Sequence, residues 1–419
     1  MAYLGMSTHR KTCLSSHETD AAQRGTTSVV STDVSRSWAR LDGVDILRGL
    51  AIFFVLMNHV NMRLFLAKIP YTQSLPSQLV SSLVWNGQHG VQMFFAVSGF
   101  LITSTSIRRW GSLSRVRVRD FYALRFARIA PLLLLLLVVL CTLHAVGLKN
   151  FVVSDKTGGL GAALIAALTF HVNVLEAHRG YLPANWDILW SLSVEEMFYL
   201  FFPPVCWLLG RGRGLVAFLL ILVVLGPLGR TALSDGNEVW QEYSYLGGMD
   251  AIALGCLTAI VSSRTTIPRG VVRILAGLGT LLVLFILAFS NQAKAWGLER
   301  SGLDMTILAI GSCMIIAAAA EIGWKSPRAI LPLITLGRRS YEVYLTHMFV
   351  VFALFGLFKS AALPIAAVPV LFIGVILISG LVGGWVARFY SEPMNRWIRQ
   401  RFGDGPDMLG SVIRSDAGA

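Results

Sequence analysis

The stretch that decides the fold is LDGVDILRGLAIFFVLMNHV, residues 41–60, an apolar segment that carries Arg48 and His59. Eleven residues separate these two, about three helical turns, so both side chains project from one face of a helix. They lie roughly 16 Å apart along the axis, about half of a ~30 Å hydrocarbon layer. Ionisable groups at such depth are costly and usually functional. The alternative is an arginine that reaches the membrane surface and a histidine that bonds to a neighbouring helix.

The rest of the chain shares this apolar character. Of its 419 residues, 55% are hydrophobic and 14% are charged, against about 25% charged in ordinary soluble proteins. No polar linker divides the apolar sequence, so we expect an all-α polytopic membrane protein with one membrane domain over residues 41–401. Residues 1–40 hold 13 Ser or Thr and no apolar core. They predict a disordered cytoplasmic tail, and residues 402–419 predict a second, short one.

The distribution of basic residues predicts the topology. An extra Gly- and Ala-rich candidate at 157–177 would be an eleventh span, but leaving it out places 26 of the 36 Lys and Arg on one side. Because cytoplasmic loops are enriched in Lys and Arg, we expect ten spans in the cell membrane, with both termini cytoplasmic. Segment 157–177 is then an outer-side or re-entrant helix. The ten spans begin near residues 44, 88, 129, 188, 214, 245, 271, 303, 340 and 364.

Several classes of function are disfavoured. The net charge of +13 is spread between apolar spans, so nucleic-acid binding is not expected. The five cysteines show no paired spacing, and neither a metal-binding motif nor an ATP-binding loop is present, so we expect neither a metal nor ATP-driven transport.

The fourth span, which begins NWDILWSLSVEEMFYLFFPP, carries a polar stripe. Ser191, Glu195 and Tyr199 recur at every fourth residue and share one face. Glu196 is the neighbouring alternative to Glu195. Carboxylates at a span entrance are costly unless they are bonded or face water, which favours a functional role over simple helix capping.

Other polar groups lie in or beside the later spans. His347 is a second intramembrane histidine and a candidate ligand or proton carrier, or else an interhelical hydrogen-bonding group. Asp250 near the outer end of the sixth span is functional or structural. Ser98 precedes Gly99 in a segment whose small residues favour close helix packing. The segment 107–128 holds seven arginines, which form either an anion site or a topology signal that faces anionic lipid.

Together these segments resemble the membrane-bound acyltransferase-3 family, the integral membrane O-acyltransferases of sugars and antibiotics. The resemblance covers nearly the whole chain from residue 41 to about 401. The segments that carry it, in family order, are LDGVDILRGLAIFFVLMNHV, GVQMFFAVSGFLIT, FYALRFARIAP, WDILWSLSVEEMFYLFFP, MDAIALGCLTA, LGRRSYEVYLTH and RFYSEPMNRW.

The resemblance also assigns motifs. The family's arginine-x10-histidine motif falls on Arg48 and His59, its Trp-x-Leu-x-Val-Glu pattern on Trp190 and Glu195, with Tyr199 following, and its basic segment on Arg125 and Arg128. It implies an acyl-CoA donor, usually acetyl-CoA. It also implies a carbohydrate hydroxyl as acceptor, such as that of an exopolysaccharide or a lipid-linked sugar.

Acyl transfer requires a base, an oxyanion donor and an anchor for the phosphates of CoA. We expect His59 to be the base, because histidine titrates near neutral pH, and Glu195 to orient its ring. Tyr199 or Ser98 could stabilise the oxyanion, and Ser191 shares the stripe with the catalytic groups. Arg48, Arg125 and Arg128 are expected to bind CoA. His347, Asp250 and Trp190 are assigned to the acceptor. Direct transfer and an acyl-histidine relay both remain open, and the competing class is a transporter or flippase.

Overall fold

The computed structural model describes residues 41–73, 75–323 and 326–402. The expected tails, 1–40 and 402–419, lie outside these residues, except for the last residue of the final helix. The described part is helical, with short 3-10 and π segments and with no strand between residues 41 and 402.

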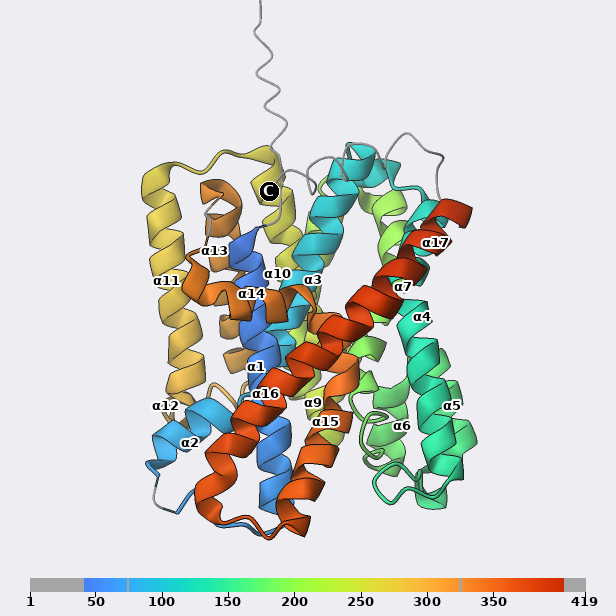
Figure 1. Ribbon diagram of the computed structural model, residues 1–419. Coiled ribbons are helices and arrows are strands. Elements are labelled where there is room, and N and C mark those ends of the chain that lie inside the picture. Colours follow the sequence, from blue (N-terminus) through green and yellow to red (C-terminus); the bar gives the residue numbers. More distant parts are fainter. Residues whose placement is uncertain (1–40, 74, 324–325, 403–419) are drawn as a thin grey trace, which may run out of the picture. The chain divides into compact units, whose positions relative to one another are not determined.

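Ten long helical runs alternate in direction (Figure 1). Several short helices connect them at the end drawn lowest in Figure 1, and another, Leu331–Arg338, lies near the middle of the view. The long runs are α1 (Asp42–Leu66), α3 (Gly87–Trp110), α4 (Val118–Ala145), α7 (Leu189–Leu209), α8 (Gly214–Arg230), α10 (Tyr245–Arg264), α11 (Arg269–Ala288), α13 (Leu303–Ile322), α15 (Ser340–Ser360) and α16 (Val368–Val386), which continues through η5 (Ala387–Ser391) into α17 (Glu392–Phe402). The short elements are α2 (Ser77–Val84), η1 (Leu113–Arg115), η2 (Asp155–Thr157), α5 (Gly159–Leu168), α6 (Val172–Arg179), α9 (Glu238–Tyr243), α12 (Ser290–Ala295), η3 (Arg328–Ile330), α14 (Leu331–Arg338) and η4 (Ile365–Ala367).

The structure confirms an all-α polytopic membrane protein. Among the described residues, nine helices are long and apolar enough to cross a bilayer. The tenth expected span is α8, whose 17 residues reach about 26 Å and so come close to the hydrocarbon thickness. The segment 157–177 is broken into α5 and α6, with 10 and 8 residues, which are both too short to span.

The two ends of the helical runs differ in charge. We call the basic end the one at which α3 ends and α4 begins, drawn at the top of Figure 1, and the other the opposite end. The expected arginine-rich loop at 107–128 is shorter than the sequence suggested. Helix α3 continues to Trp110 and α4 already begins at Val118. Arg125 and Arg128 therefore lie on a helix, which fixes their direction.

Helices α3 and α10 pack backbone to backbone. A Cβ atom on Gly99 would lie 2.0 Å from the carbonyl oxygen of Ile252, and one on Gly255 would lie 2.1 Å from that of Ala96. Only glycine permits such an approach. The small-residue segment around Gly99 is therefore packing, as its composition favours, and this contact holds the adjacent Ser98 in a fixed position against α7.

Candidate active site

The centre of the site is a pair of imidazoles from two helices that are distant in the sequence. His59 on α1 and His347 on α15 lie with their ring centroids 5.0 Å apart. His347 has no exposed surface, whereas His59 is half-buried. The sequence predicted both histidines as functional but gave no sign that they meet, because no local pattern links residues 288 positions apart.

Hydrogen bonding fixes the tautomer of His347. Its Nδ1 lies 2.6 Å from the carbonyl oxygen of Tyr344. Because a carbonyl oxygen only accepts, Nδ1 must carry the proton, which leaves the lone pair on Nε2. This Nε2 is buried and has no hydrogen-bond partner among the described residues. A buried basic nitrogen without a partner is costly and is suited to receive a proton from a substrate.

The hydroxyl of Tyr344 lies in a second set of contacts beside this pair. It donates to the carbonyl oxygen of Ile188 at 2.9 Å and lies 2.6 Å from the hydroxyl of Ser191. Ser191 therefore orients Tyr344, whose backbone in turn holds His347. Ser191 thus contacts Tyr344, which lies on the same helix as His347.

The hydrogen-bond partners of Glu195 differ from the His59 ring that the sequence predicted for it. The Oε1 atom of Glu195 accepts hydrogen bonds from Ser98 on α3 and from the hydroxyl of Tyr199, the latter at 2.5 Å. Ser98 also contacts the Tyr199 hydroxyl. The three side chains form a closed group between α3 and α7, and no hydrogen bond between Glu195 and either histidine is found in the described structure.

The three predicted arginines lie on the basic-end side of these groups. Arg125 packs on the ring of Tyr199, with its guanidinium carbon 3.6 Å from the ring centroid, and pairs with Glu196 at 3.3 Å. Arg128 pairs with Glu342 at 3.1 Å. Glu196, the sequence neighbour of Glu195, thus has its own ion-pair partner. The sequence alone could not show which of these two carboxylates pairs with an arginine.

Arg48 completes this group from α1. Its guanidinium donates to the hydroxyl of Ser340 at 2.9 Å and lies 3.8 Å from Asp45. It is also within electrostatic range of Arg128 and Glu342. Sequence reasoning missed Ser340 and Glu342. The signal was present in the segment LGRRSYEVYLTH, where a buried carboxylate precedes His347 by five residues.

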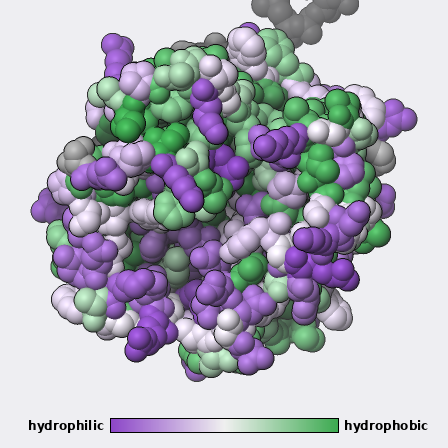
Figure 2. Space-filling model, turned by 90° about the horizontal axis from the view of Figure 1, so that it is seen from below, coloured by the Kyte–Doolittle hydropathy of each residue, from purple (hydrophilic) through white to green (hydrophobic). Residues whose placement is uncertain are grey.

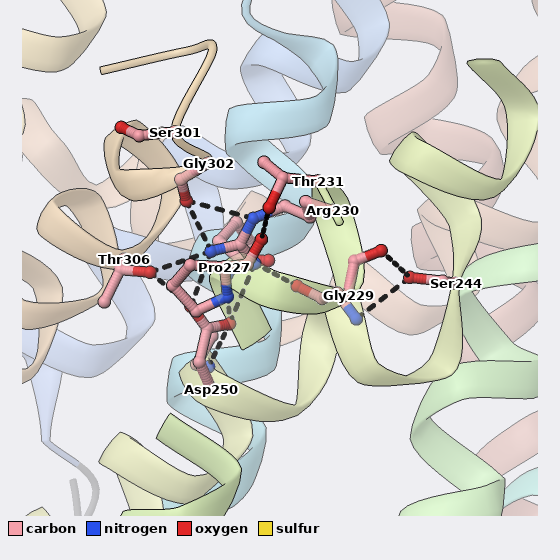
Figure 3. A network of polar contacts seen from close by, with 12 residues as sticks. Pro227, Gly229, Arg230, Thr231, Ser244, Asp250, Ser301, Gly302 and Thr306 are labelled. Atoms are coloured by element: carbon pink, nitrogen blue, oxygen red, sulfur yellow. Dashed lines mark hydrogen bonds and ion pairs between the residues drawn. The ribbon is translucent and has the colours of Figure 1, made fainter. Parts of the chain in front are cut away.

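Asp250 lies in a separate network, which Figure 3 shows from close by. Arg230 on α8 donates to both of its carboxylate oxygens, at 3.1 and 2.8 Å. Thr306 on α13 and Gln92 on α3 add bonds of 2.6 and 2.9 Å. Asp250 has no exposed surface, and a ligand would have to displace Arg230 to reach it. We therefore read Asp250 as structural and leave it out of the proposed site.

Trp190, the third residue assigned to the acceptor, is buried and stacks on Tyr243. The two rings are nearly parallel, with centroids 4.1 Å apart. Tyr243 ends α9, at the opposite end of the helical runs, so Trp190 joins α7 to the elements that cover that end. No group of three or more His, Cys, Asp or Glu placed to hold a metal ion occurs among the described residues.

This arrangement defines a class: a polytopic membrane protein in which a fully buried and a half-buried imidazole lie together between long helices, with arginines on one side of the pair. A family model described as an acyltransferase domain matches residues 41–388. The chain therefore belongs to the acyltransferase-3 family, as the sequence motifs predicted, and its membrane-spanning part is an acyltransferase domain.

Two curated relatives illustrate the similarity. The chain is 23% identical over 393 residues to O-acetyltransferase OatA of Staphylococcus aureus, covering 90% of this chain and 60% of the relative. It is 27% identical over 330 residues to peptidoglycan O-acetyltransferase OatA of Listeria monocytogenes, covering 73% of this chain and 48% of the relative. The chain thus spans about half to three-fifths of the length of these proteins. No solved structure matches it.

Proposed function

We propose that this protein is an O-acyltransferase that moves an acyl group, acetyl in the first instance, from acyl-CoA to a carbohydrate hydroxyl. The observation that supports this most directly is the unpartnered Nε2 of His347 beside His59. Membership of an acyltransferase family favours this chemistry over transport or flipping. The named substrate of the Listeria relative makes peptidoglycan a reasonable first acceptor to test.

The imidazole pair supplies the proton transfers. An imidazole nitrogen takes the proton of the acceptor hydroxyl as its oxygen attacks the thioester carbonyl. The tetrahedral intermediate then collapses, the C–S bond breaks, and the imidazolium returns the proton to the CoA thiolate. In the relay variant, an imidazole nitrogen attacks the thioester carbonyl, the C–S bond breaks and the CoA thiolate leaves. The hydroxyl oxygen then attacks the acyl-imidazole carbonyl, the C–N bond breaks, and the hydroxyl proton passes to the other imidazole and from there to the thiolate. Ser98 and Tyr199 hold hydroxyl groups beside Glu195, on the side of the site nearer to Arg125.

The donor enters from the basic end, which we take to be cytoplasmic. Arg48, Arg125 and Arg128 already pair with carboxylates or a serine, so they form a balanced network and not a bare cluster of positive charge. Arg399 on α17 adds charge that the sequence reasoning overlooked. It lies within electrostatic range of both Arg109 and Arg128, and guanidinium groups gathered in this way suit phosphates.

The direct test is an assay with the purified full-length protein in detergent or vesicles. We expect radiolabel from acetyl-CoA to appear on an added N-acetylglucosamine oligosaccharide, or to be released slowly to water when no acceptor is present. Measuring the label on the oligosaccharide and on free acetate checks both. Protein that binds the donor but neither transfers nor hydrolyses the acetyl group would overturn the proposal.

The anchor role of Arg48 gives a second prediction. Arg48→Ala is expected to raise KM for acetyl-CoA about tenfold or more, because a hydrogen bond from a charged group contributes about 1.5–3 kcal/mol. The KM for the acceptor should stay unchanged. Steady-state kinetics with each substrate varied in turn check this. Arg273→Ala, which removes an exposed arginine near the start of α11, is the matched control. An unchanged donor KM in Arg48→Ala would place the anchor elsewhere.

A further inference from the structure

A pair of carboxyl groups lies beyond the histidines, toward the opposite end. Glu176 on α6 has no exposed surface. Its Oε1 accepts a hydrogen bond from the backbone N–H of Leu182 at 2.9 Å, and its carboxyl group lies within hydrogen-bonding range of the carboxyl group of Asp187. Asp187, just before α7, interacts with Glu176 and accepts a long bond, 3.5 Å, from the hydroxyl of Tyr243. These two carboxyls have no ion-pair partner recorded within the described part of the chain.

An arginine links this pair to the imidazoles. Arg63 lies on α1, four residues after His59, and so on the same helical face. It is within electrostatic range of both His59 and Asp187. Its Nε is buried without a hydrogen-bond partner. Arg63 therefore interacts electrostatically with both the carboxyl pair and the imidazole pair.

The same segment holds more buried polar atoms that lack partners. Asn185 and Trp186 have no exposed surface, yet the Oδ1 of Asn185 and the Nε1 of Trp186 have no hydrogen-bond partner in the described structure. A buried polar group of this kind is costly unless something bonds to it. Asn185 also donates to the carbonyl oxygen of Leu345 at 2.9 Å, which places it close to His347 along α15. Asn185 and Trp186 therefore leave buried polar atoms without hydrogen-bond partners close to His347.

Aromatic rings connect this segment to the surface. Tyr181 is 54% exposed, and its ring centroid lies 5.9 Å from that of Tyr243, which stacks on Trp190. The apolar C–H faces of sugar rings pack well on such amphipathic rings. Viewed from the opposite end, hydrophilic side chains surround a recess in the surface (Figure 2).

The protonation state of the pair suits a neutral ligand. Burial raises the pKa of Asp187 to about 7 and raises that of Glu176 well above its ordinary value. At neutral pH at least one of the two carboxyls therefore holds a proton. A protonated carboxyl both donates and accepts hydrogen bonds, as sugar hydroxyls do. This favours a hydroxyl-rich carbohydrate over a cation.

We propose that Glu176, Asp187, Arg63 and Tyr181 form the acceptor site, which takes an uncharged, hydroxyl-bearing sugar from the opposite end and presents one hydroxyl to the imidazole pair. This inference rests on the proposed function for the reaction, but the binding step can be tested apart from it. Donor and acceptor would then enter from opposite ends and meet at His59 and His347.

The test compares Asp187→Asn, Glu176→Gln and Tyr181→Ala with the matched control Glu299→Gln, an exposed carboxylate that pairs with Lys294. In the full-length protein, the first three should raise KM for an N-acetylglucosamine oligosaccharide about tenfold or more. The KM for acetyl-CoA and the rate of acetyl-CoA hydrolysis without acceptor should stay within twofold of wild type. Binding of the oligosaccharide, followed by tryptophan fluorescence, should weaken in parallel.

The outcomes separate this inference from the proposed function. If wild-type protein transfers acetyl groups and all three variants keep the wild-type acceptor KM, the acceptor site is wrong while the acyltransferase proposal stands. If wild-type protein transfers no label but binds the oligosaccharide in an Asp187-dependent way, the acceptor site stands and the acyltransferase proposal is wrong. A proportional loss of transfer and acceptor-free hydrolysis also overturns the site. Tyr181→Ala changes an exposed ring, so it keeps the test decisive if a buried variant fails to fold.

Discussion

Alanine at either His59 or His347 is expected to lower the rate of acetyl transfer by a factor of about 100 to 10,000, the usual contribution of a positioned acid or base. Folding should be retained, because neither imidazole makes a side-chain hydrogen bond to another side chain in the described structure. The expected mechanism makes the two rings one unit, 5.0 Å apart. The double variant should therefore be little slower than the worse single variant.

Initial rates of label transfer at saturating acetyl-CoA measure this effect, and gel filtration in detergent checks folding. His144→Ala is the matched control, since this histidine lies near the far end of α4 and accepts only a backbone hydrogen bond. It should transfer at the wild-type rate. Added imidazole should partly restore His347→Ala, because a small base can occupy the space that the ring leaves. Wild-type rates in both single variants would refute an imidazole base.

Acid quenching of a single turnover distinguishes direct transfer from a relay. In a relay, label from acetyl-CoA stays on wild-type protein without an acceptor, and one histidine variant loses it. In direct transfer, no variant and no wild-type sample retains label. The structure favours His347 as the base, because the Tyr344 carbonyl oxygen fixes its tautomer. His59 is the imidazole that lies within electrostatic range of Arg63.

The fold followed from the sequence because its two signals are local. Apolar segments long enough to span and the one-sided distribution of arginines each report on their own stretch of chain. The helical spans, nine among the described residues against ten expected, and the interruption at 157–177 were therefore predictable. The start of α4 was not, because its first turns carry Arg119, Arg125 and Arg128 and look like a loop by composition.

The sequence indicated candidate members of the site but not the contacts between them. Motif and depth identified Arg48, His59 and Glu195, but which side chain meets which depends on helices far apart in sequence. Glu195 bonds to Ser98 and not to a histidine because α3 packs tightly on α10 and faces α7 there. The sequence did not indicate the carboxyls of Glu176 and Asp187, which lie at the end of segment 157–177 and just before α7.

The second large effect concerns stability. Asp250→Ala is expected to lower the free energy of unfolding by about 3–5 kcal/mol, because it leaves the guanidinium of Arg230 buried without its counter-ion. The side chain of Arg230 is only 9% exposed and that of Asp250 is fully buried. Arg230 would keep bonds to Thr306 and to the carbonyl oxygen of Gly302. Neither of these neutralises its charge.

Thermal unfolding in detergent measures the loss, with Glu299→Ala as the matched control. Glu299 pairs with Lys294 at 3.2 Å, but both side chains are more than half exposed, so the control should cost no more than about 1 kcal/mol. The double variant Asp250→Ala with Arg230→Met should recover much of the stability, because it removes both buried charges together. Below its unfolding temperature, Asp250→Ala should keep the wild-type KM for the acceptor. A raised acceptor KM with unchanged stability would instead show that Asp250 contributes to acceptor binding, as the sequence analysis first predicted.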